Sequence, residues 1–187
     1  YDWYVIVEMT SGRAGGELRA TMEGVLAEGL EQGLVLDAVL AESEAQAKDL
    51  WKIRESMSES QRPEGGSIKH DISVPVSLMA TFIERATRAV EDLIPGVRIV
   101  AFGHIGDGNV HFNPSQPPGA DKQAFLDRWH EIADIVHGIA HDLGGSISAE
   151  HGLGRMKREE ITRYKAPLEI ELMRKLKLTF DPKGIMN

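Results

Sequence analysis

The sequence predicts an α+β fold of ferredoxin-like type, with an antiparallel sheet, helices packed on that sheet and a C-terminal helical segment. Two strand-helix-strand units and one β-hairpin lead to this prediction, because such units form a layer of strands covered by helices. With 187 residues, 42% of them hydrophobic, the chain is long enough to bury one core, with or without a small appendage.

The first third of the chain predicts two strands and two helices. Residues 3–10 contain the apolar run WYVIV, which is typical of a buried strand. A helical pattern follows over residues 15–32, and Gly33 is suited to end it in the left-handed conformation. Residues 34–40 predict the second strand. Ser43 then caps a helix that extends to about residue 60.

The remaining elements follow from alternation, helix signals and turn residues. Residues 67–74 alternate between apolar and polar side chains, which is typical of a strand with one buried face. Residues 75–93 predict a helix, and the Pro-Gly pair at 95–96 turns the chain into the hairpin. Long amphipathic helices begin near Lys122 and are expected to cover one face.

The predicted hairpin brings two histidines together. Residues 97–102 and 110–112 are rich in β-branched and aromatic side chains, and the Asp-Gly pair at 107–108 is a typical two-residue turn. This turn places His104 directly opposite His111, with Cβ atoms roughly 5 Å apart, so both imidazoles can reach one ion. A loop longer by an even number of residues keeps the pairing, whereas a three-residue loop with a bulge breaks it.

A second segment favours a metal site. Glu150 and His151 lie in the small-residue stretch 144–154, a composition that lets the backbone approach a ligand closely. Together with the two histidines of the hairpin they form the inventory of a catalytic metal site with a base beside it. Histidines near a tight hairpin can also simply satisfy backbone groups. The surroundings of Glu150 favour the metal interpretation.

One pair of polar side chains in a predicted helix is a candidate for binding an anion. Arg54 and Ser58 are four residues apart in a predicted helix and share a face, where a guanidinium can bind a carboxylate. Lys69 lies on the polar face of strand 67–74, and His70 falls on the apolar face as a core residue. A surface ion pair for Arg54 and an ordinary solvated Lys69 are the structural alternatives. The later histidines are interpreted as a solvated or packed helix face: His130, His137 and His141.

Composition argues against several classes of protein. A formal net charge of -8 without a basic patch argues against a nucleic-acid partner. The absence of cysteine excludes disulfides and thiol chemistry. No apolar run approaches the roughly 20 residues that span a bilayer, and no signal peptide is visible. We therefore expect a soluble, cytoplasmic protein, and the start inside a strand without Met indicates a piece of a longer polypeptide.

Three motifs carry a resemblance to a known family: GHIGDGNVHFN at residues 103–113, SAEHGLG at 148–154 and FDPKGIMN at 180–187. They resemble the C-terminal, substrate-binding and metal-binding domain of the FAD-linked oxidases that oxidise D-2-hydroxy acids. That family includes D-lactate dehydrogenase, the glycolate oxidase flavin subunit and D-2-hydroxyglutarate dehydrogenase, and the last type is the most similar. The resemblance covers residues 1–187, and the separate FAD-binding domain of the family is expected to be absent from this chain.

The resemblance implies roles for individual residues. It implies a divalent metal, with zinc as first choice and manganese, iron or cobalt as alternatives, held by His104, His111 and Glu150. The implied general base is His151. The implied substrate ligands are Arg54, Ser58, Lys69 and Asn113, and Asn187 is expected to contact FAD. Ser58 departs from the threonine that is usual in the family.

The implied reaction is oxidation of a D-2-hydroxy acid to the 2-oxo acid, with hydride transfer to FAD. Lys69 favours a dicarboxylate such as D-2-hydroxyglutarate or D-malate, since a monocarboxylate leaves this cation unpaired. A D-lactate or glycolate oxidase, a non-redox ligand-binding module and a metallohydrolase remain alternatives. The expected partner is the FAD domain of the same polypeptide, without which the chain is redox-inactive. The electron acceptor and the choice between monomer and homodimer are left open.

Overall fold

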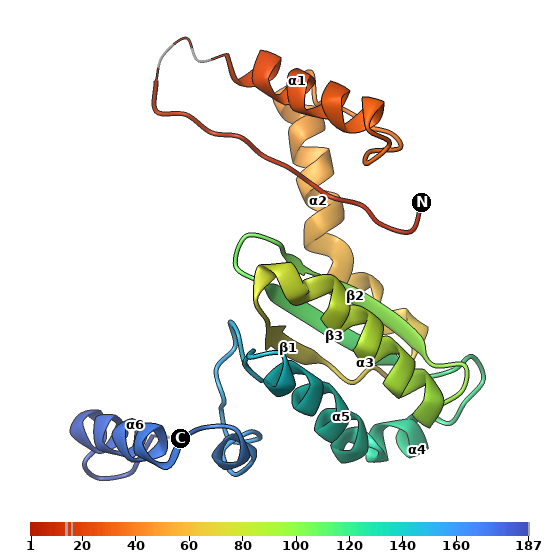
Figure 1. Ribbon diagram of the computed structural model, residues 1–187. Helices are drawn as coiled ribbons and strands as arrows, with labels where there is room; N and C mark the ends of the chain where they lie inside the picture. Colours follow the sequence, from red (N-terminus) through yellow and green to blue (C-terminus); the bar gives the residue numbers. More distant parts are fainter. Residues whose placement is uncertain (14, 16, 187) are drawn as a thin grey trace. The chain divides into compact units, whose positions relative to one another are not determined.

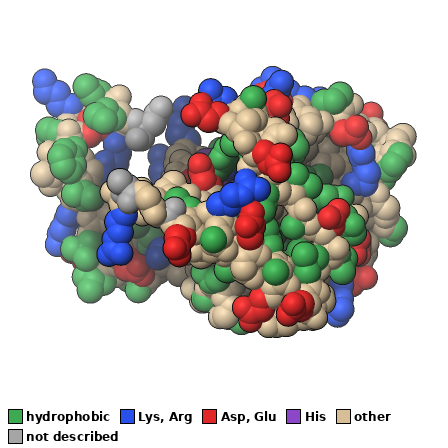
Figure 2. All heavy atoms as spheres, turned by 90° about the horizontal axis from the view of Figure 1, so that it is seen from above, with side chains coloured by type: hydrophobic (Ala, Val, Ile, Leu, Met, Phe, Trp, Pro, Cys, Tyr) green, Lys and Arg blue, Asp and Glu red, His purple; other side chains and the backbone are tan. Residues whose placement is uncertain are grey.

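The structure, a computed structural model, describes residues 1–13, 15 and 17–186 and has two units, Tyr1–Gln61 and Arg62–Asn187 (Figure 1). Its helices and its antiparallel sheet confirm the predicted α+β class. Among the described residues, no helix has the length and apolarity needed to cross a membrane. Acidic and basic side chains are interspersed with hydrophobic ones on the face drawn in Figure 2.

The first unit contains two helices at the predicted positions. α1 (Leu18–Glu31) is followed by Gln32 and then by Gly33, which has the left-handed φ of 69° expected of a glycine that ends a helix. α2 (Glu44–Ser60) begins after Ser43, whose side-chain oxygen accepts a hydrogen bond of 3.2 Å from the Gln46 N–H. This bond satisfies one of the backbone donors that the start of a helix leaves without a partner.

The two strands predicted in the first unit are wrong. Neither residues 3–10 nor residues 34–40 form a strand in the described structure, and their apolar side chains are exposed, with Val5 at 64% and Leu34 at 78%. β-branched composition marks a segment that fits a sheet, but a stable strand also needs a neighbour whose backbone pairs with it. The predicted sheet with packed helices is therefore formed by the second unit.

The second unit is built on a three-stranded antiparallel sheet in the order β1-β3-β2. Its strands are β1 (His70–Ser73), β2 (Arg98–His104) and β3 (Asn109–Ser115). Two helices, α3 (Met79–Leu93) and α5 (Trp129–Asp142), pack on one face of this sheet (Figure 1). The remaining elements are α4 (Lys122–Asp127), α6 (Pro167–Phe180) and three short 3-10 helices, Arg62–Glu64, Val76–Leu78 and Glu160–Arg163.

Alternation along the strands separates the core from a polar face, as predicted. Ile72 of β1 and Phe112 of β3 are fully buried against α3, where the Phe82 ring meets Phe112 edge to face with centroids 5.7 Å apart. His70 is buried on the same side, and Lys69 beside it is exposed. Because successive side chains of a strand point to opposite faces, the polar residues of β1 are directed away from this core.

The hairpin turn is four residues long rather than two. Residues 105–108 connect the strands, so His104 pairs with Asn109 and His111 pairs with Phe102. The predicted directly opposite pairing of His104 and His111 is therefore wrong. The loop is nevertheless longer by an even number of residues, so the period of two along each strand keeps both histidines on the same face as diagonal neighbours.

Gly108 determines how this turn closes. Its φ is 74°, and a Cβ added there would lie 1.9 Å from the carbonyl oxygen of Val74. The Val74 N–H in turn donates a hydrogen bond of 3.0 Å to the Gly108 carbonyl. The backbone at the end of β1 therefore packs directly on the turn, which only glycine allows.

A buried histidine pair links the sheet to α5. The Nδ1 atom of His70 lies 3.2 Å from Nε2 of His137, and Nδ1 of His137 pairs with the Glu160 carboxylate. Burial lowers the pKa of His70, and the neighbouring His137 lowers it further. Burial also lowers the pKa of His137, against the opposing effect of Glu160. The structure confirms His70 as a core residue and His137 as packed. The sequence did not predict that Glu160 pairs with His137.

We expect Gly108→Ala to lower the free energy of unfolding by about 2 kcal/mol or more, because the new methyl group collides with backbone at an unfavourable φ. Urea unfolding measures the loss. Gly106→Ala is the matched control in the same turn, since a Cβ at Gly106 meets nothing within 4 Å. It should cost less than about 1 kcal/mol. Equal losses in the two variants contradict the close approach of Val74.

We expect the free energy of unfolding to fall as the pH drops below about 6.5. The pKa values of His70 and His137 are lower in the folded protein than in the unfolded chain. The unfolded chain therefore binds more protons in this range, and stability rises with pH by at most about 1.4 kcal/mol per pH unit for each histidine. Urea unfolding at several pH values should give a smaller slope for His70→Phe, whereas exposed His130→Gln should keep the parent slope. An unchanged slope in His70→Phe contradicts this account.

Candidate functional site

The carboxylate of Glu150 faces two imidazoles on the polar face of the sheet. Its Oε2 atom lies 3.4 Å from Nε2 of His111, and its Oε1 atom lies 3.9 Å from Nε2 of His104. The His111 side chain is 13% exposed, whereas Glu150 and His104 are each 42% exposed. The structure thus brings together, within reach of solvent, the three side chains that the resemblance implies as metal ligands.

The sheet geometry explains where the two imidazoles lie. His104 is the last residue of β2, and His111 lies in β3 directly opposite Phe102. The ring of Phe102 packs on the His111 imidazole with centroids 5.0 Å apart and planes inclined by 32°. This contact restricts the rotation of the imidazole and leaves its Nε2 atom directed at Glu150.

Asp71 of β1 is the residue at this site that sequence reasoning missed. It is 3% exposed, and its Cα pairs with that of His111 across the sheet. Its Oδ2 atom accepts hydrogen bonds from three successive backbone N–H groups, those of Ala149 at 3.1 Å, Glu150 at 2.8 Å and His151 at 2.8 Å. The predicted alternation of strand 67–74 already placed Asp71 on the polar face, and that was the available signal.

The His151 imidazole lies beside the Glu150 and His111 pair and is open to solvent. Its side chain is 69% exposed, and its Nδ1 atom lies 4.0 Å from Oδ2 of Asp71. The ring centroid is 5.5 Å from that of His111. An accessible imidazole next to a cluster of ligand atoms is placed to exchange a proton with a molecule that binds there.

The predicted substrate ligands occur in both units. Asn113 of β3 is 3% exposed and lies two residues beyond His111, on the same face. Lys69 is exposed immediately before β1 and shares the face of Asp71. Arg54 and Ser58 lie one helical turn apart on α2 in the first unit, and their role in binding substrate stays a prediction. Asn187, the predicted FAD contact, lies outside the described residues.

Burial and nearby charges shift two pKa values at the site. Burial lowers the pKa of His111. The negative charges of Asp71 and Glu150 oppose this shift, whereas the neighbouring His151 and His104 add to it. Burial acts to raise the pKa of Asp71, but the backbone N–H groups of His151 and Glu150 lower it, and the pKa lies below its usual value. At neutral pH the His111 imidazole is therefore neutral and the Asp71 carboxyl is charged.

The donor atoms suit a divalent cation. Ligand atoms of Asp71, His111 and Glu150 lie within 4.8 Å of one another, and the His104 imidazole adds a further nitrogen. Donors bound to one zinc ion at about 2.0–2.2 Å are roughly 3–4 Å apart, which matches the 3.4 Å between Oε2 of Glu150 and Nε2 of His111. Nε2 of His104 lies 3.9 Å from the other oxygen, Oε1. Imidazole and carboxylate ligands accept zinc, and also manganese, iron or cobalt.

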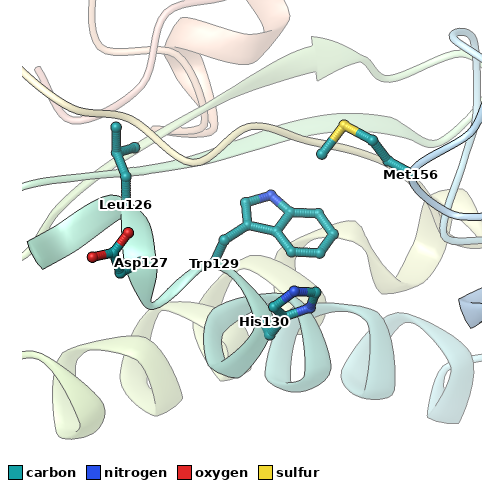
Figure 3. Close-up of a pocket in the computed structure, with 5 residues that line it drawn as sticks. All are labelled: Leu126, Asp127, Trp129, His130 and Met156. Atoms are coloured by element: carbon teal, nitrogen blue, oxygen red, sulfur yellow. The ribbon is translucent and has the colours of Figure 1, made fainter. Parts of the chain in front are cut away.

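A hollow of about 450 Å³ elsewhere on the second unit does not belong to this site. Figure 3 shows the Trp129 ring and the Met156 side chain above the start of α5, with His130 below them. The lining residues are Leu126, Asp127, Trp129, His130 and Met156, and they include none of the candidate metal ligands, the candidate base or the predicted substrate ligands.

Comparison with known proteins identifies relatives over the whole chain. The family described as FAD linked oxidases, C-terminal domain, matches residues 1–187. The D-2-hydroxyglutarate dehydrogenase of Stutzerimonas stutzeri (strain A1501) is 40% identical over 180 residues, which are 96% of this chain and 38% of the relative.

Mitochondrial relatives show a comparable similarity. The D-2-hydroxyglutarate dehydrogenase of Arabidopsis thaliana is 37% identical over 186 residues, which are 100% of this chain and 32% of the relative. The enzyme of the same name from Rattus norvegicus is 36% identical over 187 residues, which are 99% of this chain and 33% of the relative. The chain therefore spans between 32% and 38% of the length of these curated relatives.

Proposed function

Because this chain belongs to the FAD-linked oxidases, as their C-terminal domain, we propose that it binds substrate and a catalytic metal in an enzyme that oxidises a D-2-hydroxy acid to the 2-oxo acid. The observation that carries the proposal is the Glu150 carboxylate that faces both His104 and His111, with an exposed His151 beside it. Relatives named D-2-hydroxyglutarate dehydrogenase support this class of reaction. FAD, held mainly by a separate domain of the same polypeptide, supplies the acceptor for the C2 hydride.

The proposed metal ligands are His104, His111 and Glu150, with zinc as the first choice. An oxygen of Asp71 also lies within 4.8 Å of ligand atoms of His111 and Glu150, but three backbone N–H donors already occupy Oδ2 of that carboxylate, which favours His104 as the third ligand. The lowered pKa of His111 keeps its imidazole neutral and able to bind a cation at neutral pH. A divalent cation in this place supplies charge for the C1 carboxylate and polarises the 2-hydroxyl of the substrate.

His151 is the proposed acceptor of the 2-hydroxyl proton. Its Nδ1 atom lies 4.0 Å from the buried Asp71 carboxylate, which favours a proton on Nδ1 and leaves Nε2 as the basic atom. The exposure of the ring allows a substrate to approach Nε2. Loss of this proton together with the C2 hydride is the two-electron oxidation of the alcohol to the ketone.

The proposed substrate is a dicarboxylate such as D-2-hydroxyglutarate or D-malate. Lys69 is an exposed cation on the same face as the metal ligands and suits a second carboxylate. Arg54 and Ser58, which share a face of α2, stay proposed substrate ligands, and Asn113 is proposed to orient the first carboxylate. A monocarboxylate such as D-lactate or glycolate leaves Lys69 without a ligand and is the alternative substrate class.

We expect the purified intact protein to hold about one divalent metal ion per chain and His111→Ala to lose most of it, because His111 supplies a ligand nitrogen. Elemental analysis by mass spectrometry measures the metal content. His130→Ala is the control, since His130 is an exposed histidine on α5. Undiminished metal in His111→Ala, or an equal loss in His130→Ala, contradicts the assigned ligands.

We expect Lys69→Met in the intact protein to raise the KM for D-2-hydroxyglutarate by about tenfold to a hundredfold, because the variant loses one charge-assisted hydrogen bond to the substrate. The KM for D-lactate, if it is oxidised, should change little. Bleaching of the flavin without oxygen reports the reaction, and Lys122→Met on α4 serves as the control.

Two outcomes of this experiment speak against different parts of the proposal. A flavin that no D-2-hydroxy acid bleaches rules out the reaction class. Bleaching by D-lactate or glycolate but by neither dicarboxylate rules out the proposed substrate class and leaves the reaction in place.

A further inference from the structure

We propose that Asp71 is the positioning residue of this site, and that its carboxylate holds the loop bearing Glu150 and His151 through hydrogen bonds rather than by binding the metal. This inference rests on the proposed function, because it assigns a role within the same site. Asp71 comes from β1, whereas Glu150 in the loop follows 79 positions later in the chain. A single buried side chain thus connects two distant parts of the sequence.

The hydrogen bonds of Asp71 account for both of its oxygens. Oδ2 accepts from the backbone N–H groups of Ala149, Glu150 and His151, and Oδ1 accepts from Nδ2 of Asn109 at 2.9 Å. Each carboxylate oxygen offers about two acceptor positions, so the three loop donors fill the capacity of Oδ2, whereas Oδ1 accepts from Asn109. A bond from Oδ2 to a metal would require at least one of these backbone N–H groups to give up its acceptor, which is costly.

The three loop N–H groups converge on one oxygen. Such a run of successive backbone donors forms a concave anion-binding turn, and here the anion is a side chain of the protein itself. Because Asp71 binds the backbone N–H groups of residues 149–151, the side chains of Glu150 and His151 are directed outward, toward solvent. Glu150 then reaches His111 at 3.4 Å, and His151 lies with Nδ1 at 4.0 Å from the same Asp71 oxygen.

The edge of β1 adds a second attachment for the same segment. Ser73 and Ser146 exchange backbone hydrogen bonds of 3.0 Å and 2.8 Å, and the Ala149 N–H also approaches the backbone carbonyl of Asp71 at 3.2 Å. The segment from Ser146 onward therefore runs along the outer edge of β1. Because β1 pairs with β3 so that Asp71 faces His111, this attachment also sets the separation between Glu150 and its imidazole partner.

The position of His151 depends on the same carboxylate. A carboxylate near one imidazole nitrogen orients the ring and favours the tautomer with the proton on that nitrogen. At 4.0 Å the Asp71 carboxylate acts on the His151 ring through its charge, and it fixes the residue through the hydrogen bond from the His151 backbone N–H at 2.8 Å. Removing Asp71 is expected to affect both the metal ligand Glu150 and the base His151.

The test compares Asp71→Asn with Asp107→Asn in the intact protein. Both variants exchange one carboxylate for an amide near the site, but Asp107 lies in the hairpin turn, where its Oδ1 atom accepts from the Asn109 N–H. For Asp71→Asn we expect metal affinity, titrated with the metal alone, to fall by about tenfold to a hundredfold. At saturating metal its kcat should stay at least about tenfold below that of the parent, because His151 remains misplaced. Asp107→Asn should keep both values near those of the parent.

Three results overturn the proposal. Parent-like metal affinity and kcat in Asp71→Asn show that the carboxylate does not position the loop. Full recovery of kcat at saturating metal shows that His151 does not depend on it. Complete loss of metal in Asp71→Asn with full retention in His104→Ala shows that Asp71 is itself a ligand.

Hydrogen exchange of the unaltered protein provides a test that no folding defect can obscure. We expect the amide protons of Ala149, Glu150 and His151 to exchange at least about tenfold more slowly than those of an open chain. Exchange at the open-chain rate contradicts the proposal. If the parent protein binds no divalent metal and its flavin is not reduced by any D-2-hydroxy acid, the proposed function fails, while protected amides still establish the role of Asp71 in holding the loop.

Discussion

The antiparallel pairing of β3 with β1 on one side and β2 on the other constrains the direction of the strand side chains at the candidate site. Residues that face each other across such a sheet point the same way, so Asp71, His111 and Phe102 form one row. Ser73, Asn109 and His104 form the next row. The helices α3 and α5 pack with the apolar core on the opposite face of the sheet. The two rows therefore lie on the face that these helices do not cover, where polar side chains can bind a ligand.

Two adjacent residues of β1 serve separate polar clusters on the two faces. His70 points into the core and joins His137 and Glu160, while Asp71 points the other way and holds the loop with Glu150. Buried polar groups are tolerated when hydrogen bonds replace the water they lose. A short strand of four residues therefore supports both the packing of α5 and the arrangement of the ligand atoms.

Elements with a local signal were predictable, and elements that need a distant partner were not. The cap of Ser43 and the left-handed Gly33 act within a few residues, so the helices of the first unit were predicted close to their observed bounds. The apolar segments 3–10 and 34–40 look like strands but have no paired neighbour in the described structure. In the hairpin, it was predictable that the two histidines lie on the same face of the sheet. Which residues pair across the hairpin depends on packing between Gly108 and Val74, and Val74 lies outside the hairpin.

Residue types and their spacing were enough to identify the family, the three proposed metal ligands and the candidate base, because these side chains lie in two short motifs whose chemistry is visible in the chain itself. Asp71 was different. In the sequence it is one of three alternating polar residues of a strand, indistinguishable in pattern from Lys69 and Ser73. Its importance arises from hydrogen bonds to backbone groups 78 to 80 residues away, and contacts of that range exist only once the sheet has formed and brought the loop to its edge.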